Sequence, residues 1–510
     1  MKRMRKVAAI VAALTVVCNA NLSAAAPHQS PVPPERAVDT RHTIAISGQT
    51  IYYTATAGTI LLRDARRQPT ASVFYVAYTK DGTAPAQRPI TFCYNGGPGS
   101  STIWLRMGSI GPKRVVTPNA QSAGGAPFEL RDNPYSLLDK TDLVFVDAVG
   151  TGFSRLIGKG TGKMFWGVDE DVAAFGQFID HYVTRNGRWN SPKFLFGESY
   201  GTTRSANLVN YLQNRGMAFN GVVLVSTVLN FATLIPQSGN DLPYVAFLPT
   251  EAAAAWYHNR LPERPTDLSA FLAEVRRFAG GQYTDALLKG DALPSDQQTA
   301  IIAALHRYTG LPETYIRESK LRIPPDRFEK ELLRGSEETL GRLDARFLGY
   351  DLDVMADSPE YDPSDVAVSG AFVAAFNNYV RNELHWFSDD HYYPTHYDVV
   401  NRGWNWNRGE RSSPTATNVA ADLQEALTKN PRLYVFSANG YYDFATPFFG
   451  TEYTLAHLSL PRALQSHITY GYYESGHMIY LHLPSLAKLK ADLSRFYDAA
   501  IGRGNDRLQN

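Results

Sequence analysis

The sequence is poor in the features that mark several classes of protein. It has two cysteines in 510 residues, Cys18 and Cys93, and a formal net charge of only +1. Nucleic-acid binding proteins carry an excess of positive charge, so we expect no nucleic-acid partner. No repeat of the length typical of solenoids is present. The N-terminal apolar run Val7–Val17 is too short to span a bilayer.

The N-terminus has the pattern of a secretory signal peptide. Basic residues fill Met1–Lys6, the apolar run follows, and Ala20–Ala26 offers small residues for cleavage. We expect export to the periplasm or the medium, with no membrane anchor in the mature form. Cleavage would leave Cys93 as the only thiol, so the mature chain could form no internal disulfide and would depend on the size of its core.

The length predicts either several domains or one large domain with an insertion, and 44% apolar residues suffice for a core. The pattern of short β-rich runs followed by alternating strands and helices predicts an α/β protein with a mostly parallel central sheet flanked by helices. The expected divisions are a signal peptide (1–26), a proline-rich spacer (27–40), a first core part (41–235), a mainly helical cap insertion (236–375), and an aromatic-rich segment with the second core part (376–510).

Individual elements follow from hydrophobic periodicity. The region from His42 to Tyr78 reads as an antiparallel meander of short runs separated at Gly48 and Gly58. The expected helices are 168–186, 202–213, 251–259, 267–278, 295–308, 326–340 and 483–500. The aromatic-rich segment, Leu384–Arg408, is expected to be irregular packing beneath or beside the cap, with a carbohydrate-binding platform as the alternative.

The stretch Gly197-Glu198-Ser199-Tyr200-Gly201 lies between a predicted strand and a predicted helix. A serine in this context sits on a sharp turn that raises its hydroxyl above the carboxyl edge of the sheet. Glycines two residues to either side are needed because a Cβ there would collide with the turned backbone. Ser199 is therefore a candidate nucleophile, and an ordinary glycine-containing loop is the alternative.

A serine hydroxyl needs a base, and the base needs an orienting acid. In the α/β-hydrolase arrangement these follow in the order Ser, Asp, His, each on a loop after a later strand. Asp443 and His477 occupy those loops. Asp443 could instead be a turn acid near Asn439-Gly440, and His477 one of twelve histidines without a special role.

Acyl transfer also needs two N–H donors for the oxyanion. One is expected from Tyr200, and the other from the loop Asn95-Gly-Gly-Pro-Gly99, where glycines let the backbone approach the substrate. His391 and His396 lie near acidic residues, but their spacing fits no metal-ligand motif. We expect no metal and no cofactor.

Taken together, these blocks resemble the serine carboxypeptidase family, of the carboxypeptidase C and cathepsin A type. Asn95–Ser101 is similar to its signature loop, Val149–Ser154 to a second block and Gly197–Gly201 to the nucleophile block. Asp443 and Gly476-His477-Met478 look like the remaining two. The resemblance implies an α/β-hydrolase fold with a helical cap, and removal of single residues from the C-termini of peptides.

The resemblance also implies a role for each matching residue. Ser199 would be the nucleophile, His477 the base and Asp443 its orienting acid. The N–H groups of Gly97 and Tyr200 would form the oxyanion hole. The terminal carboxylate of the substrate would bind Asn95, Glu198 and the backbone of Gly96. This binding requires a protonated Glu198, since two carboxylates repel one another.

The sequence departs from the family pattern at three positions. The cysteine usual after the loop is Ser100, the usual tryptophan before it is missing, and a second carboxylate-binding glutamate is replaced by Ser109. With Ser109 there, Glu198 lacks an acidic partner, and we expect carboxylate recognition to be weaker or less steeply acid-dependent than in relatives with two glutamates.

Two other readings use the same residues. An esterase, amidase or acyltransferase would share the triad, and a non-catalytic binding protein could keep the fold. Arg204, one turn after Ser199, is expected to form a structural ion pair rather than to contact substrate. The oligomeric state and the preferred leaving residue do not follow from the sequence.

Overall fold

The computed structural model describes residues 32–409 and 416–505, so the signal peptide expected at residues 1–26 lies outside the described residues. Within the described ranges, none of the helices combines the length and apolar character needed to cross a membrane. The strands are β1 (Ala37–Ile46), β2 (Gln49–Arg63), β3 (Pro69–Lys80), β4 (Ile90–Tyr94), β5 (Lys113–Val115), β6 (Leu130–Asp132), β7 (Asp142–Val146), β8 (Arg155–Leu156), β9 (Lys193–Glu198), β10 (Gly221–Val225), β11 (Glu338–Leu340), β12 (Leu348–Tyr350), β13 (Tyr434–Gly440) and β14 (Ile468–Tyr473). The α-helices are α1 (Val168–Arg185), α2 (Tyr200–Gln213), α3 (Leu242–Tyr257), α4 (Leu268–Phe278), α5 (Thr284–Lys289), α6 (Ser295–Thr309), α7 (Glu313–Glu318), α8 (Pro325–Glu331), α9 (Pro363–Asn382), α10 (Ala420–Lys429), α11 (Phe448–Ala456), α12 (Arg462–Gln465) and α13 (Leu483–Asn505).

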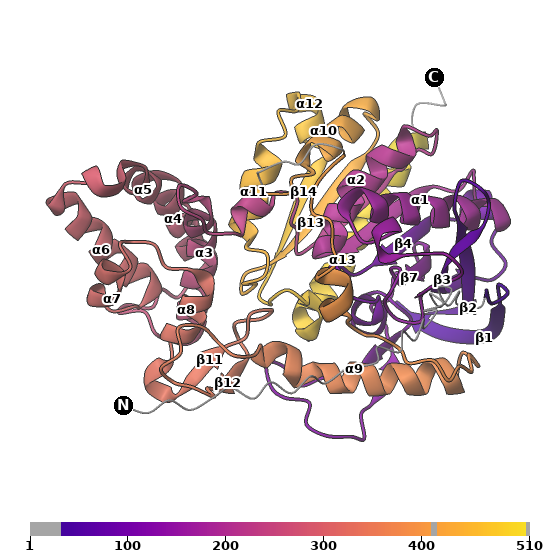
Figure 1. Ribbon diagram of the computed structural model, residues 1–510, viewed down its shortest axis with the longest axis horizontal. Coiled ribbons are helices and arrows are strands. Elements are labelled where there is room, and N and C mark those ends of the chain that lie inside the picture. Colours follow the sequence, from indigo (N-terminus) through magenta and orange to yellow (C-terminus); the bar gives the residue numbers. More distant parts are fainter. Residues whose placement is uncertain (1–31, 410–415, 506–510) are drawn as a thin grey trace, which may run out of the picture.

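One large sheet forms the centre of the molecule (Figure 1). Its strands lie in the order β1-β2-β3-β7-β4-β9-β10-β13-β14. The first three form an antiparallel meander and β3 pairs antiparallel with β7, whereas every pair from β7 to β14 is parallel. This strand order, with a strand–turn–helix at β9 and α2, is the α/β-hydrolase fold. The predicted fold class is confirmed.

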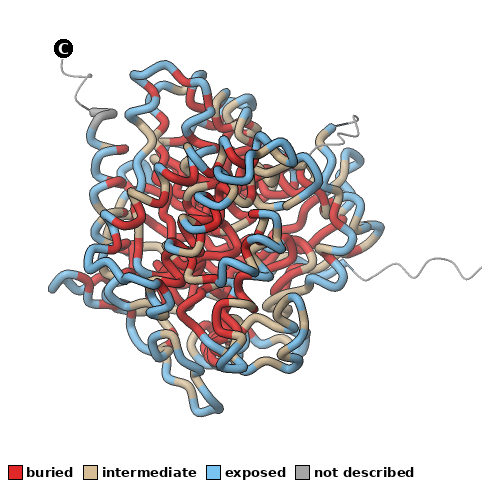
Figure 2. Tube along the Cα trace, turned by 90° about the vertical axis from the view of Figure 1, so that its left-hand side faces the viewer, coloured by how far each residue is buried: buried red, intermediate tan, exposed pale blue. Residues whose placement is uncertain are grey.

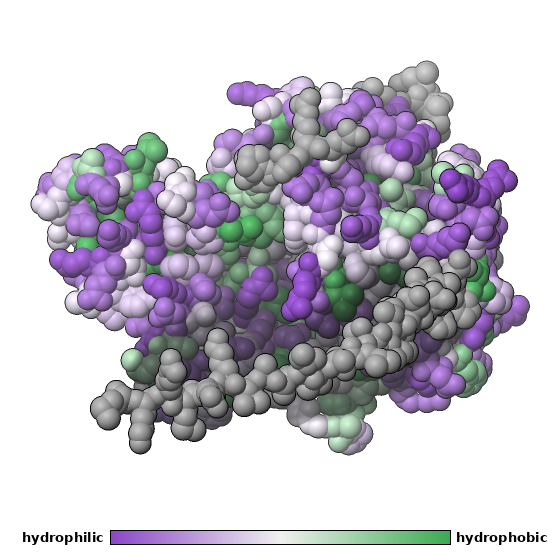
Figure 3. All heavy atoms as spheres, viewed as in Figure 1, coloured by the Kyte–Doolittle hydropathy of each residue, from purple (hydrophilic) through white to green (hydrophobic). Residues whose placement is uncertain are grey.

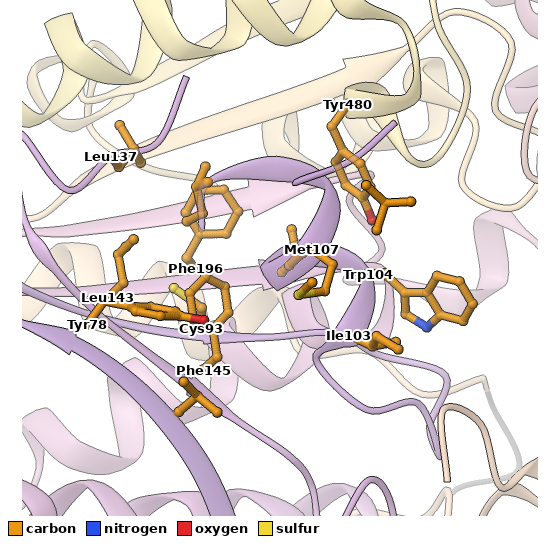
Figure 4. Close-up of a cluster of buried hydrophobic side chains, with 14 of the residues drawn as sticks. Tyr78, Cys93, Ile103, Trp104, Met107, Leu137, Leu143, Phe145, Phe196 and Tyr480 are labelled. Atoms are coloured by element: carbon orange, nitrogen blue, oxygen red, sulfur yellow. The ribbon is translucent and has the colours of Figure 1, made fainter. Parts of the chain in front are cut away.

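The central strands are apolar on both sides because helices cover both faces of the sheet. On β9, Leu195 packs in the cluster that includes residues of α1, α2 and α10. Phe194 and Phe196 point the other way, into the cluster that includes residues of α9 and α13. Figure 2 shows the resulting buried interior, and Figure 4 shows part of the second cluster, with Phe196 beside Cys93 and Phe145. Cys93 is a free, buried cysteine.

The helices α3 to α8 form a lobe beside the sheet (Figure 1), inserted between β10 and β13. The lobe has an apolar core of its own, which includes Phe271, Leu305 and Phe328. In Figure 3 hydrophobic surface is visible in the hollow between this lobe and the rest of the molecule. The lobe follows β10 at the carboxyl edge of the sheet, and its helix α3 packs against α11, which follows β13.

Several boundaries differ from those expected from the sequence. β2 continues through Gly58, because a glycine there leaves room for the Tyr75 side chain, whose hydroxyl would lie 2.8 Å from a Cβ. β1 begins at Ala37, inside the stretch expected to be a spacer up to residue 40. The helix expected over 326–340 ends at Glu331, and a turn with Glu337 at φ 58° leads into β11. The expected boundary at residue 375 falls within α9.

A buried carboxyl group lies in the lobe without a compensating partner. Glu251 on α3 is 3% exposed, and its Oε1 has no hydrogen-bond partner among the described residues. Burial raises the pKa of Glu251 from 4.5 to about 8. In the unfolded chain the same carboxyl ionises near its ordinary value, so folding is coupled to pH at this residue.

We expect Glu251 to make the protein less stable as the pH rises. Its favourable contribution is complete below pH 4.5 and is lost progressively up to about pH 8, because the unfolded chain ionises first. Between pH 5 and 8 the free energy of unfolding of the wild type should fall by about 3 kcal/mol more than that of Glu251→Gln. Denaturant unfolding at several pH values measures this, with the exposed Glu313 of α7 changed to Gln as the control. Parallel stability curves for wild type and Glu251→Gln would contradict the expectation.

Candidate active site

Ser199 occupies a strained turn between β9 and α2. Its backbone has φ 60° and ψ −131°, a conformation that costs energy in any residue with a side chain. The turn is held by the Ser199 N–H, which donates to the Val225 carbonyl at 3.0 Å. A Cβ at Gly197 would lie 2.1 Å from the Gly201 carbonyl oxygen, and one at Gly201 2.8 Å from that of Tyr94. Both glycines are therefore sterically required.

The loop after β4 lies directly against this turn. Tyr94 of β4 and Gly197 of β9 are partners in the parallel register, so the residues that follow them meet at the same edge. A Cβ on Gly96 would lie 2.4 Å from the Tyr200 backbone nitrogen, which shows how closely the two backbones approach. Gly97 has φ 106° and lines the same cavity as Ser199 and Tyr200. The two expected oxyanion donors thus come from adjacent segments.

His477 and Asp443 meet on the loops after β14 and β13. The His477 Nδ1 lies 2.8 Å from Asp443 Oδ2. A carboxylate can only accept, so Nδ1 carries the hydrogen and Nε2 is left with a free lone pair. His477 and Ser199 line the same cavity. This is the orientation that a general base beside a serine requires.

Both residues are held firmly by their surroundings. Asp443 is fully buried, and its Oδ1 accepts from the N–H groups of Ala445 and Thr446 at 2.8 and 2.9 Å. The Thr446 hydroxyl donates to Oδ2 at 2.6 Å. The backbone N–H of His477 donates a hydrogen bond to the Leu343 carbonyl at 2.6 Å. Burial alone would lower the pKa of His477, but the charge and hydrogen bond of Asp443 outweigh it, and the pKa is raised above 6.5.

Glu198, the last residue of β9, is a buried carboxyl group at the edge of the cavity. It is 3% exposed, and Asn95 Nδ2 donates to its Oε1 at 2.6 Å. Burial is the main cause that raises the pKa of Glu198 from 4.5 to about 7. Below pH 7 it is therefore mostly a neutral acid that can donate a hydrogen bond. Asn95 and Glu198 are brought together. Every other candidate residue also lines the cavity except Asp443, which lies behind His477 and contacts its Nδ1.

Arg204 forms the structural ion pair expected of it. Its Nε lies 2.6 Å from Asp171 Oδ2, and both side chains are almost completely buried. The guanidinium also donates from Nη1 to the Asn95 carbonyl at 2.8 Å. The prediction is confirmed, and the ion pair in addition holds the loop that begins at Asn95.

The cavity has a volume of about 450 Å³. Its apolar wall includes Val228, Phe231 and Leu234 near β10, and its polar wall includes Asn95, Glu198 and Ser199. Tyr397 and Asn401 also line it, so the aromatic-rich segment contributes to the site instead of only packing beside the cap. No group of three or more potential metal ligands occurs in residues 32–409 and 416–505. His396 contacts the Gly150 carbonyl through Nδ1 at 2.9 Å.

Among the residues that hold the candidate groups in place, Thr446, Ser226 and Tyr480 are not indicated as such by the sequence analysis. Thr446 could have been suspected, because a threonine three residues after an acid often closes a turn with it. Ser226, whose hydroxyl donates to the His477 carbonyl at 2.7 Å, and Tyr480, whose hydroxyl lies 3.3 Å from Glu198 Oε1, give no local signal. Their partners are more than 200 positions away in the chain.

Comparison with known proteins gave one family match. Residues 54–252, which carry the Asn95 loop and the Ser199 turn, match the family model described as serine carboxypeptidase. The comparison with curated proteins gave no match.

Solved structures that resemble the chain include hydrolases. One is a proline iminopeptidase from Mycobacterium smegmatis, with 13% identity, a TM-score of 0.35, and coverage of 91% of this chain and 100% of that chain. Another is a soluble variant of monoglyceride lipase from Saccharomyces cerevisiae, with 11% identity, a TM-score of 0.35, and coverage of 87% and 96%. Likenesses of this size carry no information about activity.

We expect a fluorophosphonate to label Ser199 at a rate that rises with pH through a midpoint above 6.5, because only neutral His477 can accept the serine proton. His477→Ala should slow labelling by about 1,000-fold or more. Active-site labelling followed by intact mass measures both effects. Ser199→Ala should remove the label, and His482→Ala, at a histidine outside the cavity, should leave the rate unchanged. A rate that is flat between about pH 5 and 9 would contradict the assignment.

Proposed function

We propose that this protein is a serine-type carboxypeptidase that releases single residues from the C-termini of peptides. The observation that carries the proposal is Glu198: a buried carboxyl group, neutral below about pH 7, within the cavity that also holds Ser199. A neutral acid at this place can donate a hydrogen bond to a substrate carboxylate, which an ionised acid would repel. The family match over residues 54–252 supports the same activity.

The reaction would follow the acyl-enzyme route. Ser199 Oγ attacks the last peptide carbonyl while His477 Nε2 takes its proton, and Asp443 stabilises the imidazolium that forms. The N–H groups of Gly97 and Tyr200 receive the developing oxyanion. His477 then gives the proton to the departing amine, and a water molecule, activated by the same histidine, hydrolyses the ester on Ser199.

Recognition of the chain end would fall to the residues beside the nucleophile. The hydroxyl of protonated Glu198 donates a hydrogen bond to the terminal carboxylate. The second N–H of the Asn95 amide donates another, and the Gly96 backbone assists. Because the Asn95 loop and the Ser199 turn are adjacent, a carboxylate bound there would be held close to the nucleophile. Cleavage one residue from the end is the outcome that we propose.

We further propose that the chain acts outside the cytoplasm. The basic, apolar and small-residue pattern of the first 26 residues supports this. The stability of the fold rests on its buried apolar clusters, and Cys93, the only free cysteine among the described residues, is buried. An exported protein of this kind needs no disulfide.

We expect the KM for an N-blocked dipeptide with a free C-terminus to be constant below pH 7 and to rise about tenfold per pH unit above it. An ionised Glu198 repels the carboxylate, whereas the methyl ester of the same dipeptide is indifferent to it. Glu198→Gln, which keeps a neutral donor, should flatten the profile. Asn95→Ala should lower kcat/KM for the acid about 10- to 100-fold, with a much smaller effect on the ester.

Steady-state kinetics with the acid and ester pair from pH 5 to 9 tests this, together with mass analysis of a digested peptide pool. Successive loss of C-terminal residues is the expected pattern. Equal KM values for acid and ester at every pH, with no trimming of the pool, would instead indicate an esterase or acyltransferase that uses the same triad.

A further inference from the structure

The two oxygens of Glu198 have different surroundings. Oε1 accepts from Asn95 Nδ2 at 2.6 Å and from the Tyr480 hydroxyl at 3.3 Å. Oε2 is buried and has no hydrogen-bond partner among the described residues. A protonated carboxyl carries its hydrogen on one oxygen only, and an oxygen that already accepts two hydrogen bonds is the poorer place for it. The surroundings therefore place the proton on Oε2.

The direction of the Asn95 amide is fixed independently. Asn95 Oδ1 accepts from the Leu105 N–H at 3.1 Å, and a backbone N–H can only donate. The NH₂ group must therefore face Glu198. This leaves no freedom for the amide to turn and offer its oxygen to the carboxyl proton.

Tyr480 reaches Glu198 from the other end of the chain. It lies in the short 3-10 turn Ile479–Leu481, just after His477 and Met478. Its ring packs on Gly108, where a Cβ would lie 2.5 Å from the ring carbons. Figure 4 shows the side chain beside Met107 and Trp104, which belong to the same stretch as Gly108. Burial raises the pKa of the phenol well above its usual value, so it remains a donor.

The serine at position 109 does not take part in this arrangement. Ser109 is fully buried, and its Oγ has no hydrogen-bond partner among the described residues. The glycine beside it, Gly108, instead admits the Tyr480 ring. A phenol from the C-terminal segment thus stands against Glu198. The other acid on the cavity wall, Asp365, instead accepts a hydrogen bond from the Ser369 hydroxyl at 2.9 Å.

We propose that Tyr480 is a positioning residue for recognition of the substrate carboxylate: its hydroxyl, with the Asn95 amide, occupies Oε1 of Glu198 and leaves the Oε2 hydroxyl as the donor to the chain end. This inference rests on the proposed carboxypeptidase function. It assigns the selectivity for a free C-terminus to a neutral acid held by a phenol and an amide.

The hydrogen bond from Tyr480 also affects ionisation. The groups that act on Glu198 are His477, Asp443, Tyr480 and Asn95, and Tyr397 lies within its electrostatic reach. The charged side chains of Arg342 and Asp365 line the same cavity. Burial raises the pKa of Glu198, while the donors Tyr480 and Asn95 and the charge of His477 lower it. Removal of the phenol hydroxyl therefore takes away a group that favours the carboxylate, and the pKa of Glu198 should rise further.

The test is Tyr480→Phe, measured with the acid and ester dipeptides over pH 5 to 9. We expect the pH midpoint of the acid KM to move up by about one unit, since one hydrogen bond to the carboxylate is lost. The acid KM at pH 5 should rise several-fold, because Oε1 is then less fully occupied. The kcat for both substrates and the KM for the ester should stay within twofold of wild type.

Tyr473→Phe is the matched control, because the Tyr473 hydroxyl donates to Asp492 Oδ2 at 2.8 Å, away from the cavity. It should change none of these parameters. Gly108→Ala keeps the hydroxyl but displaces the ring, and should raise the acid KM selectively. If Tyr480→Phe does not fold, Gly108→Ala tests the role of Tyr480 in its place.

The outcomes separate the two proposals. If wild type does not distinguish acid from ester, the proposed function fails, and this inference fails with it. If wild type does distinguish them but Tyr480→Phe keeps the wild-type midpoint and acid KM, only the role of Tyr480 is overturned. Equal losses on acid and ester in Tyr480→Phe would show a merely structural residue and would overturn it as well.

Discussion

The site depends on close backbone contact between two segments, the loop that begins at Asn95 and the turn at Ser199. β4 and β9 are neighbours in the sheet, with Tyr94 paired to Gly197, so that the loop from Asn95 and the turn at Ser199 emerge side by side. They can touch because Gly96 has no side chain: a Cβ there would lie 2.4 Å from the Tyr200 nitrogen. The same register sets Asn95 opposite Glu198. The places of the proposed nucleophile, oxyanion donors and carboxylate-binding pair are thus consequences of one strand pairing.

This dependence explains how much the sequence could predict. The α/β-hydrolase fold follows from alternating strands and helices, and its topology assigns Ser199, Asp443 and His477 to loops at one edge. The glycines around Ser199 report a steric constraint that acts within five residues, so they are visible locally. Arg204 could be predicted to pair because an unpaired guanidinium one turn into a buried helix would cost too much free energy.

The remaining features depend on contacts that no local pattern records. Tyr480 meets Glu198 across 282 positions, and its place depends on the absence of a side chain at Gly108. The sequence pattern predicts a strand break at Gly58, because glycine favours turns. In the structure β2 continues through Gly58, and the missing side chain leaves room for the Tyr75 ring on β3. The helix expected over 326–340 is shorter than predicted because its last residues make contacts outside the helix. The pairing of β11 with β12 outweighs the helical pattern after Glu331.

The positions of the protons link the two halves of the site. In the proposed reaction, attack requires a neutral His477, whereas recognition of a chain end requires a protonated Glu198. Both groups have raised pKa values, and each acts on the other: the charge of His477 lowers the pKa of Glu198, and that of Glu198 raises the pKa of His477. In the productive state Glu198 is protonated and His477 is neutral. It competes with a state in which that proton has moved to Nε2 of His477, which leaves Glu198 ionised. Two donors to Glu198 Oε1 alone would favour the carboxylate and hence the unproductive state. The burial of Glu198 opposes them, and an arriving carboxylate, which needs a donor at Oε2, draws the proton to Glu198. If the proposed function holds, substrate binding itself selects the state in which His477 is free to act as a base.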